Sequence, residues 1–251
     1  PHGPYNETPQ NYKDLYPQTE LILRENVPSG DETAAKTDLQ GYYGHIKILD
    51  EQIGRLMDYL DNNGLADNTL IVFTADHGDM LHSHGREGKN VSFEEATRVP
   101  FIARLPGSIP PGTVTQEMIS SIDLYPTLCG LCGLSVPPSK DGTDFSDLLL
   151  GNTSEGRPNV FLFSRRVNKI GWSGIRTPQY TYSWDADSGT PHRLFDNYAD
   201  PWQQNNLAGN PDYDAQVLNM HDMLISWLRQ TDDPLTEKAI AVRSCLTGDF
   251  N

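Results

Sequence analysis

The segment TLIVFTADHGDMLHSHGREGKN, at positions 69–90, gathers side chains that bind metal ions. Four consecutive apolar residues follow its first residue, Thr69, and it holds three of the chain's seven histidines. Aspartate offers a hard oxygen and neutral histidine a nitrogen to a cation. The adjacent Asp76 and His77 can bind one ion if the chain turns sharply, which Gly78 permits. A simple turn, capped by Asp76 and with His77 in solvent, fits the local pattern equally well.

The predicted elements place these two residues at the edge of a sheet. The apolar run predicts a buried strand at 70–75, and ligands of open α/β sheets bind at the carboxyl ends of such strands. Apolar residues at helical spacing predict a helix at 42–62. A second buried strand is predicted at 99–105 and a second helix at 119–131. Helices between continuous apolar strands indicate a parallel sheet covered on both faces.

The two ends of the chain differ from its middle in their residue pattern. Residues 1–35 predict a loop with one short helix. Beyond residue 150, a loop at 151–158 precedes short strands that alternate with turns and predict an antiparallel meander followed by a helix. The strands are expected at 160–163, 174–177, 180–184 and 192–195, the helix at 213–229, and the domains at 1–158 and 159–251.

Composition limits the class of partner. The net charge of −15 argues against nucleic acid, because phosphate binding needs clustered Lys and Arg. A small anionic substrate remains compatible, since a metal ion and one lysine make a pocket locally positive. The sequence holds no run of 18 apolar residues, so no membrane partner is expected. Only two or three strands are predicted in residues 1–165, fewer than an open parallel sheet usually has.

Several segments together resemble the sulfatase family of the alkaline-phosphatase-like superfamily. TLIVFTADHGDMLHSHG with the following lysine resembles the family's metal-binding strand and loop, and YYGHIKILDEQIGRLMDYLDNNGLADNT resembles its long helix. FEEATRVPFIARLPG, SIDLYPTLCGLCGL and DGTDFSDLLLG follow in the family's order, and RLFDNYADPWQQNNLAGNP is similar to its small C-terminal domain. The resemblance implies an α/β fold: part of a mixed, mostly parallel sheet sandwiched by helices, plus a small antiparallel sheet with a helix.

The resemblance also implies roles for single residues. Asp76 and His77 would bind a divalent cation, although many relatives have Asn at the second position. Lys89, thirteen residues after Asp76, would contact the sulfate. PHGPY at the start resembles a family segment whose histidine, here His2, contacts the sulfate and protonates the departing alcohol oxygen. Imidazole suits that role. His84 would either line the pocket, as a substrate contact, or shape the loop.

Other polar residues are expected to have minor roles or none in the site. Asp79 is expected to support the site or cap the loop, and His82 is given no role. His192 and Arg193 are expected to be exposed strand residues, although the family's C-terminal domain borders its cleft.

The family's nucleophile motif, Cys or Ser followed by x-Pro/Ala-x-Arg, is absent from the sequence, as is the family's pair of acidic metal ligands. In relatives both lie upstream of the PHxPY segment. The chain is therefore expected to be the C-terminal half of a sulfatase, with the N-terminal half as its partner and the source of the formylglycine nucleophile. Calcium is the expected cation, because the carboxylate ligands are hard, with magnesium or manganese next.

The expected function is hydrolysis of a sulfate ester, with a sulfated sugar as one such substrate. Two alternatives stay open: a phosphonate or phosphate ester hydrolase on the same scaffold, and a non-catalytic fragment. The resemblance favours a periplasmic, extracellular or lysosomal location.

Overall fold

The structure, a computed structural model, describes residues 1–138, 140–166 and 169–247, without the side chains at 166–170, 190–192 and 247. The chain forms two compact units that interleave along the sequence. The sequence predicts two consecutive domains that meet between residues 158 and 159. The compact units are a different kind of division, so that boundary stays a prediction. Unit 1 consists of Pro1–Lys89, Arg98–Thr113 and Leu149–Gly151, and unit 2 of Asn90–Thr97, Val114–Leu148 and Asn152–Asn251.

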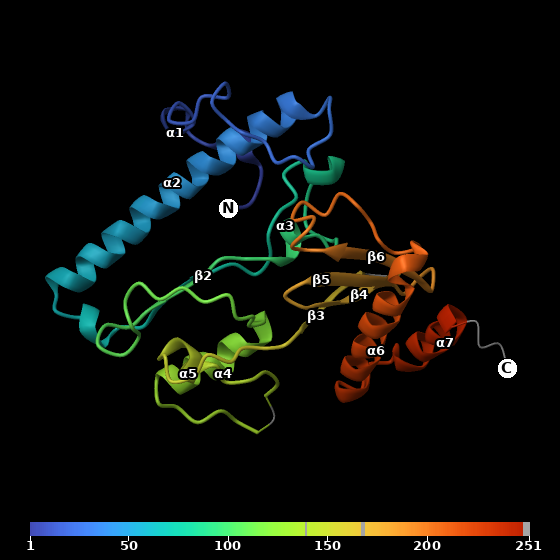
Figure 1. Ribbon diagram of the computed structural model, residues 1–251. Coiled ribbons are helices and arrows are strands. Elements are labelled where there is room, and N and C mark those ends of the chain that lie inside the picture. The colour runs from blue at the N-terminus through green and yellow to red at the C-terminus, as the bar shows by residue number, and fades with distance from the viewer. Residues whose placement is uncertain (139, 167–168, 248–251) are drawn as a thin grey trace. The chain divides into compact units, whose positions relative to one another are not determined.

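The long helix α2, Glu32–Asn62, dominates unit 1 (Figure 1). Its predicted end is correct, but it begins ten residues before the predicted start at 42. Residues 32–40 favour helix without forming an apolar stripe, so periodicity could not detect them. Gly41 and Gly44 lie inside the helix because the N-terminal segment crosses it there. A Cβ at Gly41 would lie 2.1 Å from the Tyr5 carbonyl oxygen.

The N-terminal segment is held on α2 by side chains. It contains the 3-10 turn η1, Tyr5–Glu7, and the short helix α1, Gln10–Lys13, in agreement with the prediction. Thr8 Oγ1 donates to the Gly41 carbonyl at 3.0 Å, and Tyr12 Oη donates to Glu51 Oε2 at 2.8 Å. The segment that carries His2 is thereby fixed to the helix.

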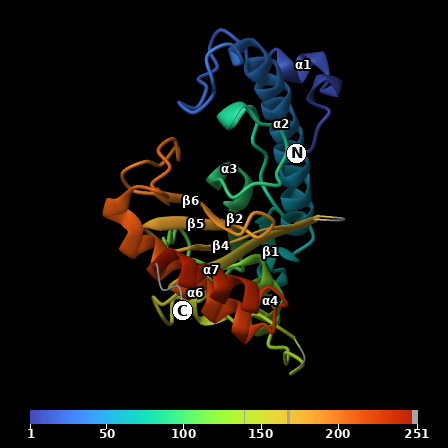
Figure 2. The ribbon, with the colours of Figure 1, turned by 90° about the vertical axis from the view of Figure 1, so that its right-hand side faces the viewer.

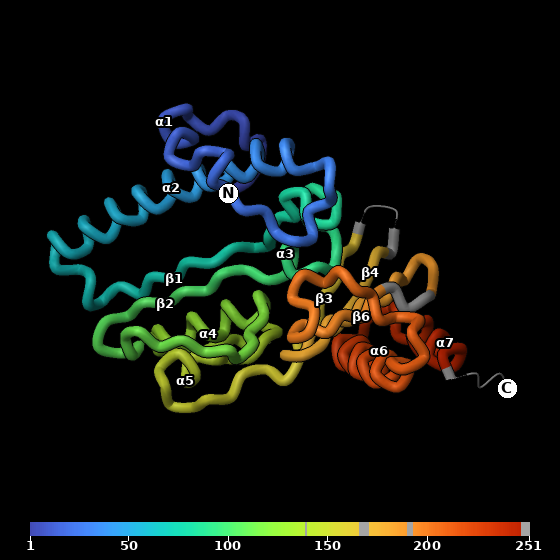
Figure 3. Tube along the Cα trace, turned by 45° about the horizontal axis from the view of Figure 1, so that its top comes forward, coloured from blue at the N-terminus to red at the C-terminus, as the bar shows by residue number. Residues whose placement is uncertain are grey.

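The strands β1, Ile71–Thr74, and β2, Phe101–Arg104, form a two-stranded antiparallel sheet in unit 1 (Figure 3). The parallel arrangement indicated by the apolar runs is not formed between these two strands, which pair antiparallel, as a mixed sheet allows. A parallel connection needs a crossover of a dozen or more residues, usually a helix. Between these strands the chain forms only the 3-10 turn η3, Ser83–Gly85, and the four-residue helix α3, Glu94–Thr97.

Unit 2 contains a four-stranded antiparallel sheet with α6, Asp214–Gln230, on one face and α7, Thr236–Thr247, beside that helix (Figure 2). This confirms the predicted meander and the helix predicted at 213–229, although that helix is not the last one. Helix α7 was not predicted, because its sequence lacks a clear apolar stripe. The strands are β3, Val160–Arg166; β4, Lys169–Arg176; β5, Tyr180–Asp185; and β6, Thr190–Asp196. Fully buried side chains between sheet and helices include Ile175, Tyr182, Trp184, Leu194, Met220, Leu224 and Leu228.

The predicted helix at 119–131 is also present in unit 2. It starts as the 3-10 turn η4, Ser121–Asp123, and continues as α4, Leu124–Leu131. Ser120 and Asp123 form a capping box, and the buried Asp123 carboxylate accepts two hydrogen bonds from Arg157. The remaining short helices are η2, Ala66–Asn68; α5, Ser146–Leu149; and η5, Pro211–Tyr213. No helix in the described part of the chain is long and apolar enough to cross a membrane.

Candidate active site

The loop after β1 folds back on itself around η3. Met80 N donates to the Gly88 carbonyl at 2.8 Å, and His82 N donates to the Arg86 carbonyl at 2.9 Å. The non-glycine residues Leu81, His82 and His84 have positive φ angles of 42°, 69° and 56°. Such angles are uncommon in non-glycine residues and frequently mark functional segments. The tight turn brings Lys89 back beside Asp79.

Two histidines anchor this loop to other parts of unit 1. His82 Nε2 lies 2.9 Å from Asp38 Oδ2 on α2, so the residue without a predicted role forms an ion pair when it is protonated. His84 N donates to the Asn26 carbonyl at 2.7 Å, and its Nε2 lies 3.1 Å from Asn26 Nδ2. His84 is not among the residues that line the adjacent pocket. Its substrate contact stays a prediction.

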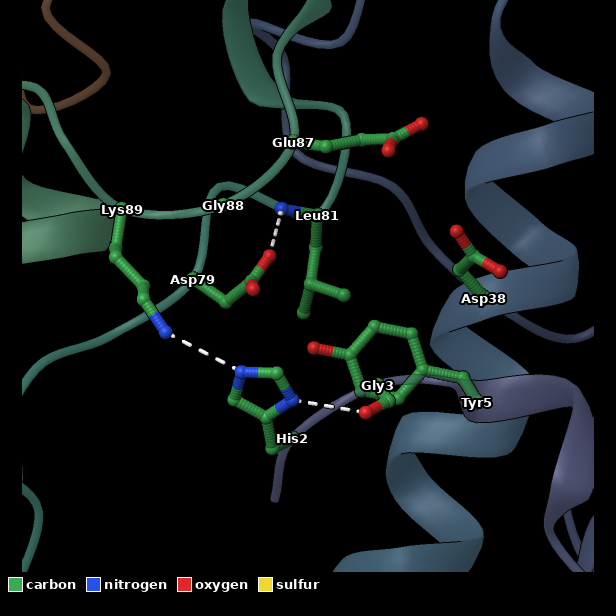
Figure 4. A pocket seen from close by; sticks show the side chains of 9 residues that line it. All are labelled: His2, Gly3, Tyr5, Asp38, Asp79, Leu81, Glu87, Gly88 and Lys89. Carbon is green, nitrogen blue, oxygen red and sulfur yellow. Dashed lines mark hydrogen bonds between the residues drawn. The ribbon is translucent and has the colours of Figure 1, made fainter.

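His2 and Lys89 meet although they lie 87 positions apart in the sequence. Lys89 Nζ is 3.2 Å from His2 Nε2. Both side chains face a cavity of about 200 Å³ within unit 1 (Figure 4). The N-terminal segment, helix α2 and the loop after β1 each contribute to its wall. The lining residues are His2, Gly3, Tyr5, Asp38, Asp79, Leu81, Glu87, Gly88 and Lys89.

The hydrogen bonds of His2 define its tautomer. Its Nδ1 lies 2.8 Å from the Gly3 carbonyl oxygen, which can only accept, so Nδ1 carries the hydrogen. Nε2 is then free to accept from the Lys89 ammonium, which can only donate. The ammonium has two further N–H groups for an anion in the pocket. The pair therefore forms the cationic end of the cavity.

Asp76 and His77 follow β1 directly, as predicted. Asp76 Oδ1 accepts a hydrogen bond from His77 N at 3.0 Å, and Asp76 Oδ2 lies 3.5 Å from His77 Nε2. The backbone N–H of His77 lowers the pKa of Asp76, and the charges of His77 and Lys89 lower it further. An ionised carboxylate, as a metal ligand must be, is thus favoured.

These two residues fit a cation site in part. The Asp76 side chain is 86% exposed, so its carboxylate can bind an ion without losing a buried partner. Calcium takes six to eight oxygen ligands, and two adjacent side chains cannot supply them. Among the residues that the structure describes, no group of three or more His, Cys, Asp or Glu side chains is arranged to hold a metal ion. A complete site needs ligands beyond these two.

Four side chains of the pocket were not predicted as site residues: Tyr5, Asp38, Leu81 and Glu87. Asp38 lies before the predicted helix, and Glu87 lies in the ligand-rich segment 69–90 but was given no role there. Tyr5 was noted only as part of the PHGPY segment. Burial raises the pKa of the Tyr5 phenol, and the nearby Asp79 carboxylate raises it further. Asp79 itself caps the loop, because its Oδ1 accepts from Leu81 N at 2.9 Å.

The distal residues with weaker expectations lie in unit 2. Arg193 Nη1 donates to Ser92 Oγ at 3.3 Å, and its guanidinium lies 4.6 Å from the centre of the Phe93 ring. Arg193 is therefore half-buried against residues of its own unit rather than exposed as expected. The side chain of His192 lies outside the described residues.

Family comparisons cover most of the chain. The sulfatase family model matches residues 1–134, and the model of the N-sulphoglucosamine sulphohydrolase C-terminal region matches residues 83–230. An ulvan-active sulfatase of Formosa agariphila is 37% identical over 223 residues, which are 86% of this chain and 43% of that protein. An N-acetylglucosamine-6-O-sulfatase of Bacteroides thetaiotaomicron is 27% identical over 78% of this chain and 36% of its own length.

Solved structures of sulfatases and related hydrolases also match this chain. The candidate sulfatase yidJ of Bacteroides fragilis matches with a TM-score of 0.86 and 30% identity, over 95% of this chain and 54% of that one. The phosphonate monoester hydrolase of Agrobacterium radiobacter matches with a TM-score of 0.72 and 30% identity, over 79% and 42%. These matches confirm the predicted alkaline-phosphatase-like α/β fold. The chain spans about half the length of these proteins, or less.

Proposed function

Because this chain belongs to the sulfatase family, we propose that the protein containing it hydrolyses sulfate esters, with the sulfate bound at the cationic end of the pocket. The supporting observation is the meeting of His2 and Lys89 at 3.2 Å, although 87 positions separate them. Both residues match family motifs, and both lie within the region covered by the family model.

The chemistry of the two groups suits this reaction. The Lys89 ammonium would donate hydrogen bonds to the sulfate oxygens and stabilise the charge that develops on them. Once an anion has displaced Lys89 from its Nε2, His2 would take up a second proton there and pass it to the departing alcohol oxygen. Its present hydrogen bond to Lys89 is at the pocket surface, so an anion can replace it without unfolding any element.

The remaining parts of the reaction would come from beyond this chain. The sequence has no formylglycine motif, so the nucleophile would lie in an N-terminal half, as in relatives. Asp76 and His77 would supply two ligands to a cation, with calcium first and magnesium or manganese next. The cation would polarise the sulfate oxygens when bound. The histidine is the less usual ligand for calcium, whose ligands are mostly oxygens.

A sulfated sugar is the proposed substrate, because one similar protein is an N-acetylglucosamine-6-O-sulfatase. Cleavage of such substrates in the periplasm, outside the cell or in a lysosome is part of the same proposal and rests on family resemblance.

A second candidate is hydrolysis of phosphonate monoesters. The likeness to the phosphonate monoester hydrolase favours it, together with His77 at a position where many sulfatases have Asn. Both reactions need an anion site and a leaving-group acid. His2 and Lys89 would therefore keep their roles.

The decisive experiment compares 4-nitrophenyl sulfate with phenylphosphonate esters. Purified chain and chain joined to its N-terminal half are assayed in parallel, with and without a chelator. We expect turnover of the sulfate by the joined protein only, lost on chelation and restored by calcium. Turnover confined to phosphonates would replace the proposal by the second candidate. Robust turnover by the chain alone would contradict the location of the nucleophile.

A further inference from the structure

The charged side chains of the pocket are unevenly placed. Lys89, His2 and the Asp79 carboxylate lie on one side of Tyr5 and Leu81, whereas the carboxylates of Glu87 and Asp38, with no cation drawn beside them, lie on the other (Figure 4). All belong to unit 1. A sulfate ester held at Lys89 would extend its alcohol part across the ring of Tyr5 toward these carboxylates.

The loop geometry creates this arrangement. Glu87 and Lys89 are separated only by Gly88, whose φ of +77° suits glycine and turns the chain. The Gly88 carbonyl is fixed by the hydrogen bond from Met80 N at 2.8 Å. The two flanking side chains therefore point in different directions, one to each end of the cavity (Figure 4).

The carboxylates of Asp38 and Glu87 differ in their partners within the protein. Asp38 Oδ2 is paired with His82 at 2.9 Å. Glu87 is exposed and makes no hydrogen bond or ion pair with the residues that the structure describes. An exposed carboxylate at a pocket wall can accept hydrogen bonds from a ligand without breaking any bond of the protein.

We propose that Glu87, supported by Asp38, selects the alcohol part of the substrate by its charge. A hydroxyl-rich or amine-bearing alcohol, such as a neutral or amino sugar, is accepted. An alcohol that carries a carboxylate or a second sulfate is disfavoured. This inference rests on the proposed function, because it takes the anion of the substrate to lie at Lys89.

The expected effect of the Glu87 charge on kcat/KM follows from Coulomb's law. A charge about 6 Å from a surface carboxylate interacts by about 0.7 to 1.4 kcal/mol at effective dielectric constants of about 80 to 40. This corresponds to a roughly three- to tenfold effect on kcat/KM for a cationic or an anionic substrate. The two effects have opposite signs, so the ratio of the two kcat/KM values changes most.

The test uses the chain joined to its N-terminal half and three aryl sulfates. These are the 4-aminomethyl, 4-hydroxymethyl and 4-carboxymethyl phenyl sulfates, in which a methylene group insulates the leaving oxygen from the charge. We expect kcat/KM to decrease in that order. Glu87→Gln should lower the ratio of kcat/KM for the cationic substrate to kcat/KM for the anionic one by about tenfold or more. Glu20→Gln, at an exposed position outside the pocket, should leave all three values unchanged.

An unchanged ratio in the Glu87→Gln variant would overturn the inference, as would an equal loss for all three esters. If none of the sulfates is hydrolysed, the proposed function fails separately. Equilibrium affinities of the same three esters, measured by calorimetry with both proteins, then decide the charge preference. Equal affinities would overturn it, and the same order with a reduced spread in Glu87→Gln would support it.

Discussion

The pocket of unit 1 and the core of unit 2 each contain a histidine with the same pattern of hydrogen bonds. His2 donates to a backbone carbonyl from one ring nitrogen and accepts from Lys89 at the other. His221 likewise donates to a backbone carbonyl and accepts from the Tyr182 hydroxyl at 2.8 Å. The two differ in burial, because His221 is fully buried and His2 is exposed.

Burial decides whether the His221–Tyr182 pair or the His2–Lys89 pair can exchange a partner for a ligand. In the core it lowers the pKa of His221 and raises the pKa of Tyr182, so both groups keep their uncharged forms. No ligand reaches them. In the pocket, a bound anion can take the place of either partner. A replaceable partner, rather than the hydrogen-bond pattern itself, therefore distinguishes a candidate site from a structural pair.

The sharpest way to test this comparison is to remove each ring. His221→Ala should lower the free energy of unfolding by about 3–5 kcal/mol, because it leaves a cavity and an unpaired Tyr182 hydroxyl. His2→Ala should change it by less than about 0.5 kcal/mol. Urea denaturation followed by tryptophan fluorescence measures both. Tyr182→Phe, which keeps the core filled, should cost about 1–2 kcal/mol. Equal losses for the two alanine variants would break the comparison.

A second prediction concerns the catalytic side of the comparison. Lys89→Ala should lower kcat/KM for an aryl sulfate by about a hundred- to a thousandfold in the joined protein, as expected for loss of a donor to developing charge. The melting temperature should stay unchanged, since the ammonium holds no buried group. Lys140→Ala, at an exposed position of unit 2, serves as control. Activity within twofold of the parent would show that Lys89 does not bind the reacting group.

A third prediction tests the surface that carries His2. Gly41→Ala forces the Tyr5 backbone away from α2 and should cost about 1–3 kcal/mol. It should also lower activity by moving His2. Gly54→Ala on the same helix meets no atom within 4 Å and should stabilise the protein by about 0.5–1 kcal/mol. Thermal melts of both variants give the signs, and the same sign for both would contradict the crossing described above.

The smallest expected effect depends on pH. The folded pKa of His221 lies below its unfolded value of about 6.5, so the unfolded state binds the proton first. The contribution of His221 to stability is complete above that value and is lost as pH falls toward the folded pKa. The pKa of Asp222 is lowered mainly by Arg243, so its loss occurs in the separate, more acidic range of carboxylates.

Melting curves at pH 7.5 and 5.5 measure this effect. We expect the parent to lose more stability over this interval than His221→Gln, which cannot take up the proton. Identical slopes for the two proteins would show that His221 is not the titrating group.

The sequence predicted most elements but not how they meet. The stripe of apolar residues revealed α2 from residue 42 onward, whereas its first ten residues form no such stripe, and only the folded chain shows that another segment crosses the helix at Gly41. The antiparallel pairing of β1 with β2 was not predicted, because apolar runs do not encode the direction of a strand. His2 and Lys89 came from family motifs. Asp38 and Glu87 had no such signal, since their place in the pocket arises from the turn at Gly88 and from the helix start.

The anchoring of the loop after β1 also limits how this region can diversify. The turn between Leu81 and Arg86 is held by its own backbone pairing, by Asn26 and by Asp38. An insertion or a transplanted loop would lose these anchors unless both outside residues moved with it. Exchange of a single side chain at Glu87 disturbs none of them. Variation in substrate preference would therefore be expected to proceed here by point substitution, with the loop length kept constant.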